Sequence, residues 1–105
     1  MVGIDLVFMP EFKKRLETVD LHTILLDSEL RENRLIESLA GLFAAKEAFF
    51  KALGRKADWH EVWIEKDKEG KPRLQSLLLP AGSHAEVSIA HSGDYAVAVV
   101  ILNFL

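Results

Sequence analysis

The sequence predicts an α+β fold in which one long helix packs on a mostly antiparallel sheet. Three observations support this prediction. An alternating apolar segment opens the chain, a proline-free stretch rich in Leu, Ala, Glu and Arg spans residues 27–53, and alternation returns in the second half. The chain has 105 residues, half of them hydrophobic, and contains no linker-like segment. We therefore expect a single domain over residues 1–105.

The N-terminal segment is expected to form a strand. Asp5 should point to one face of it, opposite a buried row of alternating apolar side chains. Asp5 is unusual there, because strand propensity disfavours a lone carboxylate in an apolar strand. Pro10 ends the strand, and residues 11–16 are expected to form a short basic helix. The expected buried row is Val2, Ile4, Leu6 and Phe8.

A long helix is expected over residues 27–53. Asp27 or Ser28 is the expected N-cap, and Gly54 is the expected residue beyond the C-terminus. Gly41 lies inside this stretch and could mark a break, a slight bend or a close helix contact.

Four strands joined by tight turns are expected after the helix, as an antiparallel meander. The last of them is apolar on both faces and should be the central strand of the sheet. The expected strands span residues 59–65, 73–79, 85–90 and 95–102.

Composition excludes several classes of protein. The chain has no cysteine, which removes disulfides, zinc–thiolate sites and thiol nucleophiles. Its net charge is −3 at pH 7, so no nucleic-acid partner is expected. Asp5 interrupts the apolar N-terminal run, which is unlike a signal peptide, and the longest purely apolar stretch, residues 96–102, is far too short to span a membrane. We expect a soluble, cytoplasmic protein without membrane contact.

Only three charged side chains lie between Leu39 and Gly54 in the predicted helix: Lys46, Glu47 and Lys51. A helix this apolar is normally buried, so its charges need partners. Lys46 falls among the large apolar side chains, where its amine must reach solvent or meet an anion. Glu47 and Lys51 are spaced i,i+4, which on its own is typical of an intrahelical ion pair.

Asp5 supports a second interpretation, a metal and phosphate site. The carboxylates of Asp5 and Glu47 could share a divalent cation, and Mg²⁺ suits this because it takes one or two carboxylates and leaves positions for phosphate oxygens. Nearby lysines would neutralise the remaining phosphate charge. Ser88 and His91, at the end of a predicted strand, could also hold an anion. The alternative is that Ser88 is an ordinary strand hydroxyl and His91 caps a turn.

Together these segments resemble the holo-acyl-carrier-protein synthase family, the small 4′-phosphopantetheinyl transferases of fatty-acid synthesis. The matching pieces occur in the family's order and span nearly the whole chain, and the middle piece is the most specific. They are Gly3–Val7, Phe43–Gly54, Asp67–Pro72, Ser88–His91 and Tyr95–Ala98.

This resemblance implies a 4′-phosphopantetheinyl transferase-like fold and Mg²⁺-dependent transfer of 4′-phosphopantetheine from coenzyme A to a serine of apo-acyl carrier protein. It implies that Asp5 and Glu47 bind Mg²⁺. It also implies that Glu47 and Lys51 are catalytic, with Glu47 assisting removal of the serine proton and Lys51 contacting the phosphates. The family commonly forms trimers with active sites at subunit boundaries, so a homotrimer is expected. The residues expected to bind coenzyme A are Lys46, Lys51, Gly54, Ser88 and His91.

Several positions depart from the family's pattern. Glu11 stands where a basic residue is usual, Leu42 where arginine is common, and Ala90 where a hydroxyl residue usually precedes the histidine. The glycine-rich loop after the helix is reduced to residues 55–57. An alternative therefore stays open, in which the chain is a non-catalytic or weakened relative that binds coenzyme A or a carrier protein. Basic residues that could substitute are Lys13, Lys14, Arg15, Arg55 and Lys56.

Overall fold

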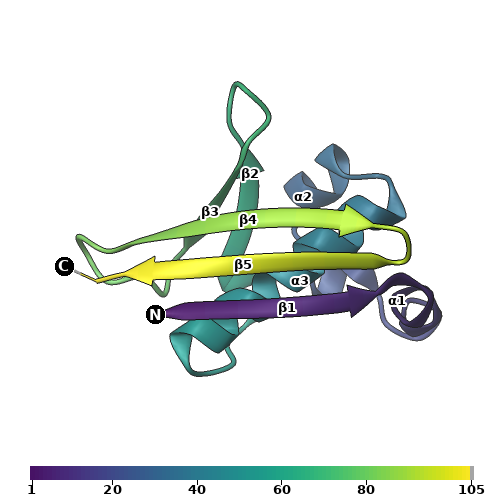
Figure 1. Ribbon diagram of the computed structural model, residues 1–105, viewed down its shortest axis with the longest axis horizontal. Helices are drawn as coiled ribbons and strands as arrows, with labels where there is room; N and C mark the ends of the chain where they lie inside the picture. Colours follow the sequence, from purple (N-terminus) through teal and green to yellow (C-terminus); the bar gives the residue numbers. More distant parts are fainter. Residues whose placement is uncertain (105) are drawn as a thin grey trace.

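The computed structural model describes residues 1–104, which form two antiparallel sheets and three α-helices (Figure 1). The larger sheet has the order β1–β5–β4, and β2–β3 form a separate pair. The predicted α+β class, with a long helix on an antiparallel sheet, is confirmed. The strands are β1 (Val2–Phe8), β2 (Val62–Lys66), β3 (Pro72–Ser76), β4 (His84–Ser92) and β5 (Tyr95–Asn103). The helices are α1 (Met9–Arg15), α2 (Asp27–Glu32) and α3 (Ile36–Leu53), with 3₁₀ turns η1 (Leu21–Thr23) and η2 (Trp59–Glu61).

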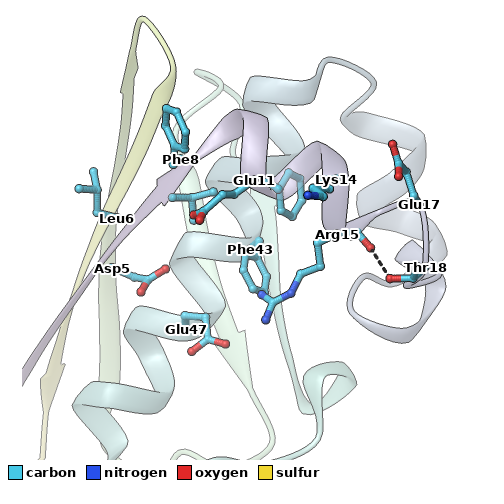
Figure 2. Close-up of a pocket in the computed structure, with 12 residues that line it drawn as sticks. Asp5, Leu6, Phe8, Glu11, Lys14, Arg15, Glu17, Thr18, Phe43 and Glu47 are labelled. Carbon is cyan, nitrogen blue, oxygen red and sulfur yellow. Dashed lines mark hydrogen bonds between the residues drawn. The ribbon is translucent and has the colours of Figure 1, made fainter.

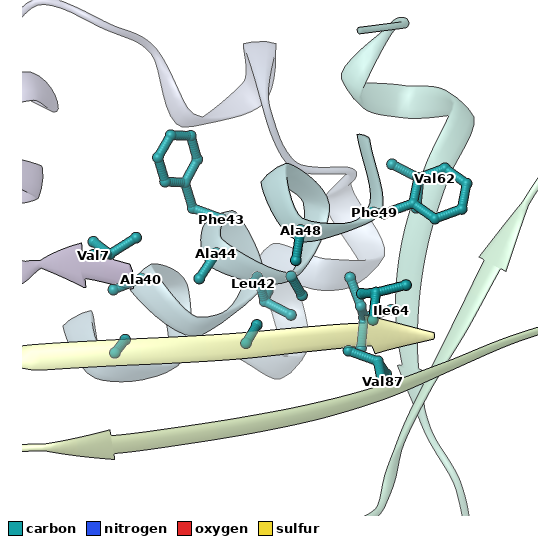
Figure 3. Packing of buried hydrophobic residues seen from close by; sticks show 14 of the residues in the cluster. Val7, Ala40, Leu42, Phe43, Ala44, Ala48, Phe49, Val62, Ile64 and Val87 are labelled. Carbon is teal, nitrogen blue, oxygen red and sulfur yellow. The ribbon is translucent and has the colours of Figure 1, made fainter. Parts of the chain in front are cut away.

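Helix α3 packs across one face of the larger sheet, and small residues let the two approach closely. A Cβ atom at Gly3 would overlap the backbone of Ala48 and Ala52, so β1 can lie this close to α3 only with glycine at that position. The apolar core lies between α3 and this face of the sheet, and it extends to Val62 and Ile64 of β2 (Figure 3).

The buried face of β1 is opposite to the predicted one. Gly3 and Val7 are buried against α3, whereas Ile4 and Leu6 are each 61% exposed. The surface of α3 that meets β1 consists of alanines. It packs closely against the face of β1 that carries Gly3, and it leaves no room there for large side chains. The prediction that the alternating apolar row is buried is therefore wrong within one chain. That row forms an exposed apolar face of the sheet, made of Val2, Ile4, Leu6 and Phe8 of β1 with Tyr95 and Ile101 of β5.

The long helix predicted over residues 27–53 is two helices. Asn33 takes an extended conformation (φ −132°, ψ 105°) after α2, and its Nδ2 donates to the carbonyl oxygen of Glu29 at 2.9 Å. Gly41 does not break α3. A Cβ atom there would lie 2.8 Å from Cγ2 of Ile89, so this glycine permits close approach of a strand and not of a helix. Gly54 ends α3 with φ 84°, as predicted.

The predicted four-stranded meander is wrong, because β3 pairs only with β2 while β4 pairs only with β5 among the described residues. The first strand begins later than predicted, at Val62, because Asp58 caps a 3₁₀ turn over residues 59–61. The second ends early, at Ser76, whose hydroxyl donates to the carbonyl oxygen of Glu61 at 2.8 Å and accepts from the N–H of Leu78 at 3.0 Å. The predicted central position of the last strand is confirmed. Within residues 1–104, no helix combines the length and apolarity needed to cross a bilayer.

Candidate functional site

The carboxylates of Asp5 and Glu47 face the same open pocket (Figure 2). The pocket has a volume of about 670 Å³ and lies between β1, α1 and α3. Asp5 belongs to the face of β1 that packs on α3, between Gly3 and Val7, and Glu47 directly precedes Ala48, the residue that Gly3 contacts. The close crossing of β1 and α3 therefore brings together the two residues that the sequence analysis paired.

Each of these carboxylates has a lysine partner. Lys51 Nζ donates to Asp5 Oδ1 at 2.9 Å and to the carbonyl oxygen of Ile4 at 3.0 Å. Lys56 Nζ lies 3.2 Å from Glu47 Oε1. No ion pair joins Glu47 to Lys51 anywhere in residues 1–104, so the intrahelical pair that their spacing allowed is wrong. The partners come from a strand and a loop instead.

Sequence reasoning did not identify Lys56 as the partner of Glu47. It named Lys56 only as one of several basic residues that could replace the family's loop. A signal was available, since a glycine at the predicted end of a helix favours a left-handed conformation that turns the chain, as Gly54 does with φ 84°. A basic residue two positions beyond such a turn can lie beside the last turns of the helix.

Helix α1 supplies further charges to the pocket. Glu11, Lys14 and Arg15 line it, and the Cζ atom of Arg15 lies 5.6 Å from the ring centroid of Phe43, within cation–π distance (Figure 2). The pocket thus has two carboxylates at its base and side chains of both charges along its rim, and the lysines beside the carboxylates could hold an anionic ligand next to a bound metal ion.

Lys46 lies outside this pocket, although it precedes Glu47 in sequence. Its side chain is 0% exposed, and its ammonium donates to Glu29 Oε1 at 2.8 Å and to the carbonyl oxygens of Ile24 and Trp59 at 2.8 and 3.0 Å. These three acceptors use all three of its hydrogens. Burial lowers the pKa of Lys46, while the hydrogen bond and charge of Glu29 oppose this shift. With no donor left for a phosphate, Lys46 has a structural role here, which corrects the expectation that it binds coenzyme A.

Ser88, His91 and Gly54 do not join Asp5 and Glu47 within one chain. Ser88 is exposed on the outer face of β4, in the row that contains Val99 and Ile4, whereas Asp5 lies on the inner face. His91 is exposed at the end of β4, in a separate depression that Lys13 also lines. Gly54 is exposed at the C-terminal end of α3, three residues beyond Lys51.

The donor set of the pocket fits Mg²⁺. Asp5 and Glu47 offer oxygen ligands, and their side chains are only 16% and 20% exposed, so packing holds them in place. Within residues 1–104, no cluster of three or more ligating side chains could hold a metal ion by itself. Such a pair suits Mg²⁺, which keeps several waters and shares its coordination with substrate phosphates instead of filling an all-protein cage.

Two largely covered carboxylates, each with a lysine partner, in one open pocket define a candidate phosphoryl-transfer site. A family model described as ACPS, 4′-phosphopantetheinyl transferase superfamily, matches residues 1–100, and the chain belongs to this superfamily. The resemblance found in the sequence is thereby confirmed.

Two proteins of similar sequence are both named holo-[acyl-carrier-protein] synthase. The chain is 42% identical over 100 residues to the holo-[acyl-carrier-protein] synthase of Halalkalibacterium halodurans, covering 91% of this chain and 80% of that protein. It is 38% identical over 118 residues to the synthase of the same name from Anoxybacillus flavithermus, covering 99% and 95%.

Solved structures show the same fold. The Helicobacter pylori holo-[acyl-carrier-protein] synthase in complex with coenzyme A superposes with a TM-score of 0.86 at 27% identity, covering 98% of this chain and 100% of that one. The synthase from Bacillus anthracis, in complex with CoA (3′,5′-ADP), superposes with a TM-score of 0.83 at 31% identity, covering 96% and 93%.

Proposed function

We propose that this chain is a holo-[acyl-carrier-protein] synthase. It transfers 4′-phosphopantetheine from coenzyme A to a serine hydroxyl of apo-acyl carrier protein, in a Mg²⁺-dependent reaction of fatty-acid biosynthesis in the cytoplasm. The observation that carries the proposal is the placement of Asp5 and Glu47 in one pocket beside Lys51. The synthases of the same name and the two coenzyme A complexes support the choice of substrates.

Asp5 and Glu47 would hold Mg²⁺ through their carboxylate oxygens. When bound, Mg²⁺ neutralises charge on the pyrophosphate of coenzyme A and so favours attack at phosphorus. Lys51 lies against Asp5 with its side chain 53% exposed, so its ammonium can turn from the carboxylate to a phosphate oxygen. Its role is to stabilise the negative charge that develops on the phosphate oxygens in the transition state.

Glu47 is the protein group that assists removal of the serine proton. In the transfer, the serine oxygen forms a bond to the β-phosphorus while the bond from that phosphorus to the bridging oxygen breaks. Adenosine 3′,5′-bisphosphate leaves with the bridging oxygen, and the serine proton passes to a base such as the Glu47 carboxylate. General-base assistance requires Glu47 to lie within hydrogen-bond reach of the incoming hydroxyl, and its position in the open pocket allows that approach.

The exposed apolar face of β1 and β5 supports a homotrimer. Its side chains, among them Ile4 and Leu6, are as large as core residues, and a patch of this kind commonly marks an interface. Ser88 lies on the same outer face, so a neighbouring copy could bring Ser88 to a pocket that it cannot reach within its own chain. In this assembly Ser88, His91 and Gly54 would complete the coenzyme A site. Sedimentation equilibrium should give three times the chain mass, and a monomer would contradict this part of the proposal.

The decisive experiment is an incubation with coenzyme A, Mg²⁺ and apo-acyl carrier protein, followed by intact-mass measurement of the carrier. We expect the carrier to gain the mass of one phosphopantetheine group, and to gain nothing when Mg²⁺ is removed with a chelator. Binding of coenzyme A without transfer would instead support the non-catalytic relative that the departures at Glu11 and Leu42 left open.

A further inference from the structure

The two carboxylates of the pocket are covered by lysines that are free to leave them. Lys56 Nζ lies 3.2 Å from Glu47 Oε1, and Lys51 Nζ lies 2.9 Å from Asp5 Oδ1. The lysine side chains are 66% and 53% exposed, whereas packing covers most of each carboxylate side chain. Because exposed ion pairs contribute little free energy, either ammonium can move away at small cost while the carboxylates stay in place.

Lys56 is held near Glu47 by a second contact. Its Nζ lies 5.3 Å from the ring centroid of Trp59, and Trp59 in turn packs against Phe43 and Phe50 with centroid distances of 5.3 Å to each. A cation over an aromatic face retains attraction when its hydrogen-bond partner changes. Lys56 therefore stays beside the pocket even when its ion pair with Glu47 is broken.

Building on the proposed function, we propose that Lys56 is a second ligand for the pyrophosphate of coenzyme A, and that it waits on Glu47 until Mg²⁺ takes this carboxylate. The exchange conserves charge at the carboxylates, since two ammonium groups leave and one divalent cation arrives. The exchange also frees the ammonium groups of Lys51 and Lys56 to contact the pyrophosphate. Lys51 already has this role through the resemblance to the family. The added ligand is Lys56, which belongs to the shortened loop at residues 55–57, where this chain departs from the family's pattern.

The test compares Lys56→Met with Arg55→Met by calorimetric titration of coenzyme A in the presence of Mg²⁺. Arg55 is the adjacent exposed basic residue, it makes no ion pair within residues 1–104, and its replacement removes the same charge. We expect Lys56→Met to weaken coenzyme A binding about tenfold, the effect of losing one charge-assisted hydrogen bond, and Arg55→Met to change it less than twofold. Lys56→Arg should retain most of the affinity.

A second titration, with Mg²⁺ alone, should show a change of affinity in the opposite direction. Lys56→Met removes the group that competes with Mg²⁺ for Glu47, so the Lys56→Met variant should bind Mg²⁺ more tightly than the Arg55→Met variant, which has the same net charge. Equal effects of the two variants on both ligands would overturn the proposal, because they would reduce Lys56 to a general contribution of charge. If wild-type protein binds no coenzyme A with Mg²⁺, the proposed function itself fails and the inference fails with it.

Dephospho-coenzyme A identifies which phosphate is involved. It retains the pyrophosphate and lacks the 3′-phosphate, so the loss caused by Lys56→Met should be the same with this ligand as with coenzyme A. A loss that disappears with dephospho-coenzyme A would assign Lys56 to the 3′-phosphate and contradict the proposed role.

Discussion

Two lysines of α3, Lys46 and Lys51, each pair with a carboxylate, but in opposite environments. Lys46 and Glu29 are 0% and 1% exposed, and every donor of the ammonium has an acceptor inside the fold. Lys51 is 53% exposed, and its partner Asp5 faces an open pocket. The first pair is closed to any ligand, whereas the second is open to the pocket in which the proposed function places a metal ion and a phosphate.

The difference shows how one helix can serve two purposes. Glu29 accepts hydrogen bonds from the backbone N–H groups of Leu26 and Ile64 as well as from Lys46, so the buried pair connects α2, α3 and β2. This connection fixes the rotation of α3, and with it the direction of Glu47, the next residue. The buried lysine and the pocket carboxylate are thus adjacent residues whose side chains point about 100° apart around the helix.

The largest expected effect comes from breaking the buried pair. Lys46→Met leaves the Glu29 carboxylate buried without its charged partner, and we expect a loss of about 3–5 kcal/mol in the free energy of unfolding. Urea denaturation measures this loss. The double variant Lys46→Met with Glu29→Leu serves as the control and should recover part of it, because no unpaired charge is left. If Lys46→Met keeps wild-type stability and loses only coenzyme A binding, the structural role of Lys46 is contradicted.

Lys51→Met should give the reverse pattern. Its exposed ion pair contributes about 1 kcal/mol or less to stability, so unfolding should change little. As a phosphate ligand, Lys51 should matter for the affinity or turnover of coenzyme A by about 2 kcal/mol or more. Steady-state kinetics with intact-mass detection measures the effect on coenzyme A, and urea denaturation measures the effect on stability. Normal kinetics in Lys51→Met would restrict this residue to its contact with Asp5.

A smaller effect is expected at the basic residues of α1, where the acidic carrier protein would dock. Charge reversal at Lys13 and Lys14 should raise the KM for carrier protein without changing coenzyme A affinity, and Glu11→Arg should lower that KM. Added salt should weaken docking of the wild type, because exposed charges are screened beyond about 10 Å at 0.1 M. An unchanged KM in both variants would move the docking surface to another part of the chain, such as Arg55 and Lys56.

The smallest effect concerns a third pair, His22 and Asp20, which lies at the surface. The hydrogen bond and the charge of Asp20 raise the pKa of His22 above its ordinary value of 6.5. A raised pKa stabilises the fold fully below pH 6.5, and this contribution is lost as pH rises through the folded-state value. Asp20→Asn should therefore lower the urea midpoint slightly more at pH 5.5 than at pH 8.5. Equal shifts at the two pH values would show that the pair does not contribute through charge.

Residue chemistry made part of the site predictable. A carboxylate in an apolar strand or an apolar helix carries a free-energy cost, because burial removes its hydration. This cost identified Asp5 and Glu47 as candidate site residues from the sequence. The need of Lys46 for an anion followed from the same reasoning. The α+β class followed from the change of hydrophobic period along the chain.

Partner choice and exposed faces were not predictable in this way. Spacing alone paired Lys51 with Glu47, but the close approach at Gly3 brings Asp5 to Lys51 instead. Nothing local identifies Glu29 as the partner of Lys46, because the two meet only after α2 folds back on α3. The alternating row of β1 predicted that Ile4 and Leu6 are buried, but within one chain α3 covers the opposite face of the strand. Long-range packing decides all three points.

The most direct test of the open pair is the Mg²⁺ dependence of coenzyme A binding in Asp5→Asn. An amide supplies less negative charge to a hard cation than a carboxylate, while its similar shape preserves the packing against α3. Circular dichroism and urea denaturation verify that the variant is folded. Calorimetry should then show that Mg²⁺ strengthens coenzyme A binding to the wild type and has no such effect on Asp5→Asn, which should also fail to modify the carrier. An equal Mg²⁺ effect in both proteins would contradict the assignment of Asp5 as a metal ligand, and with it the division of roles between the two lysine pairs.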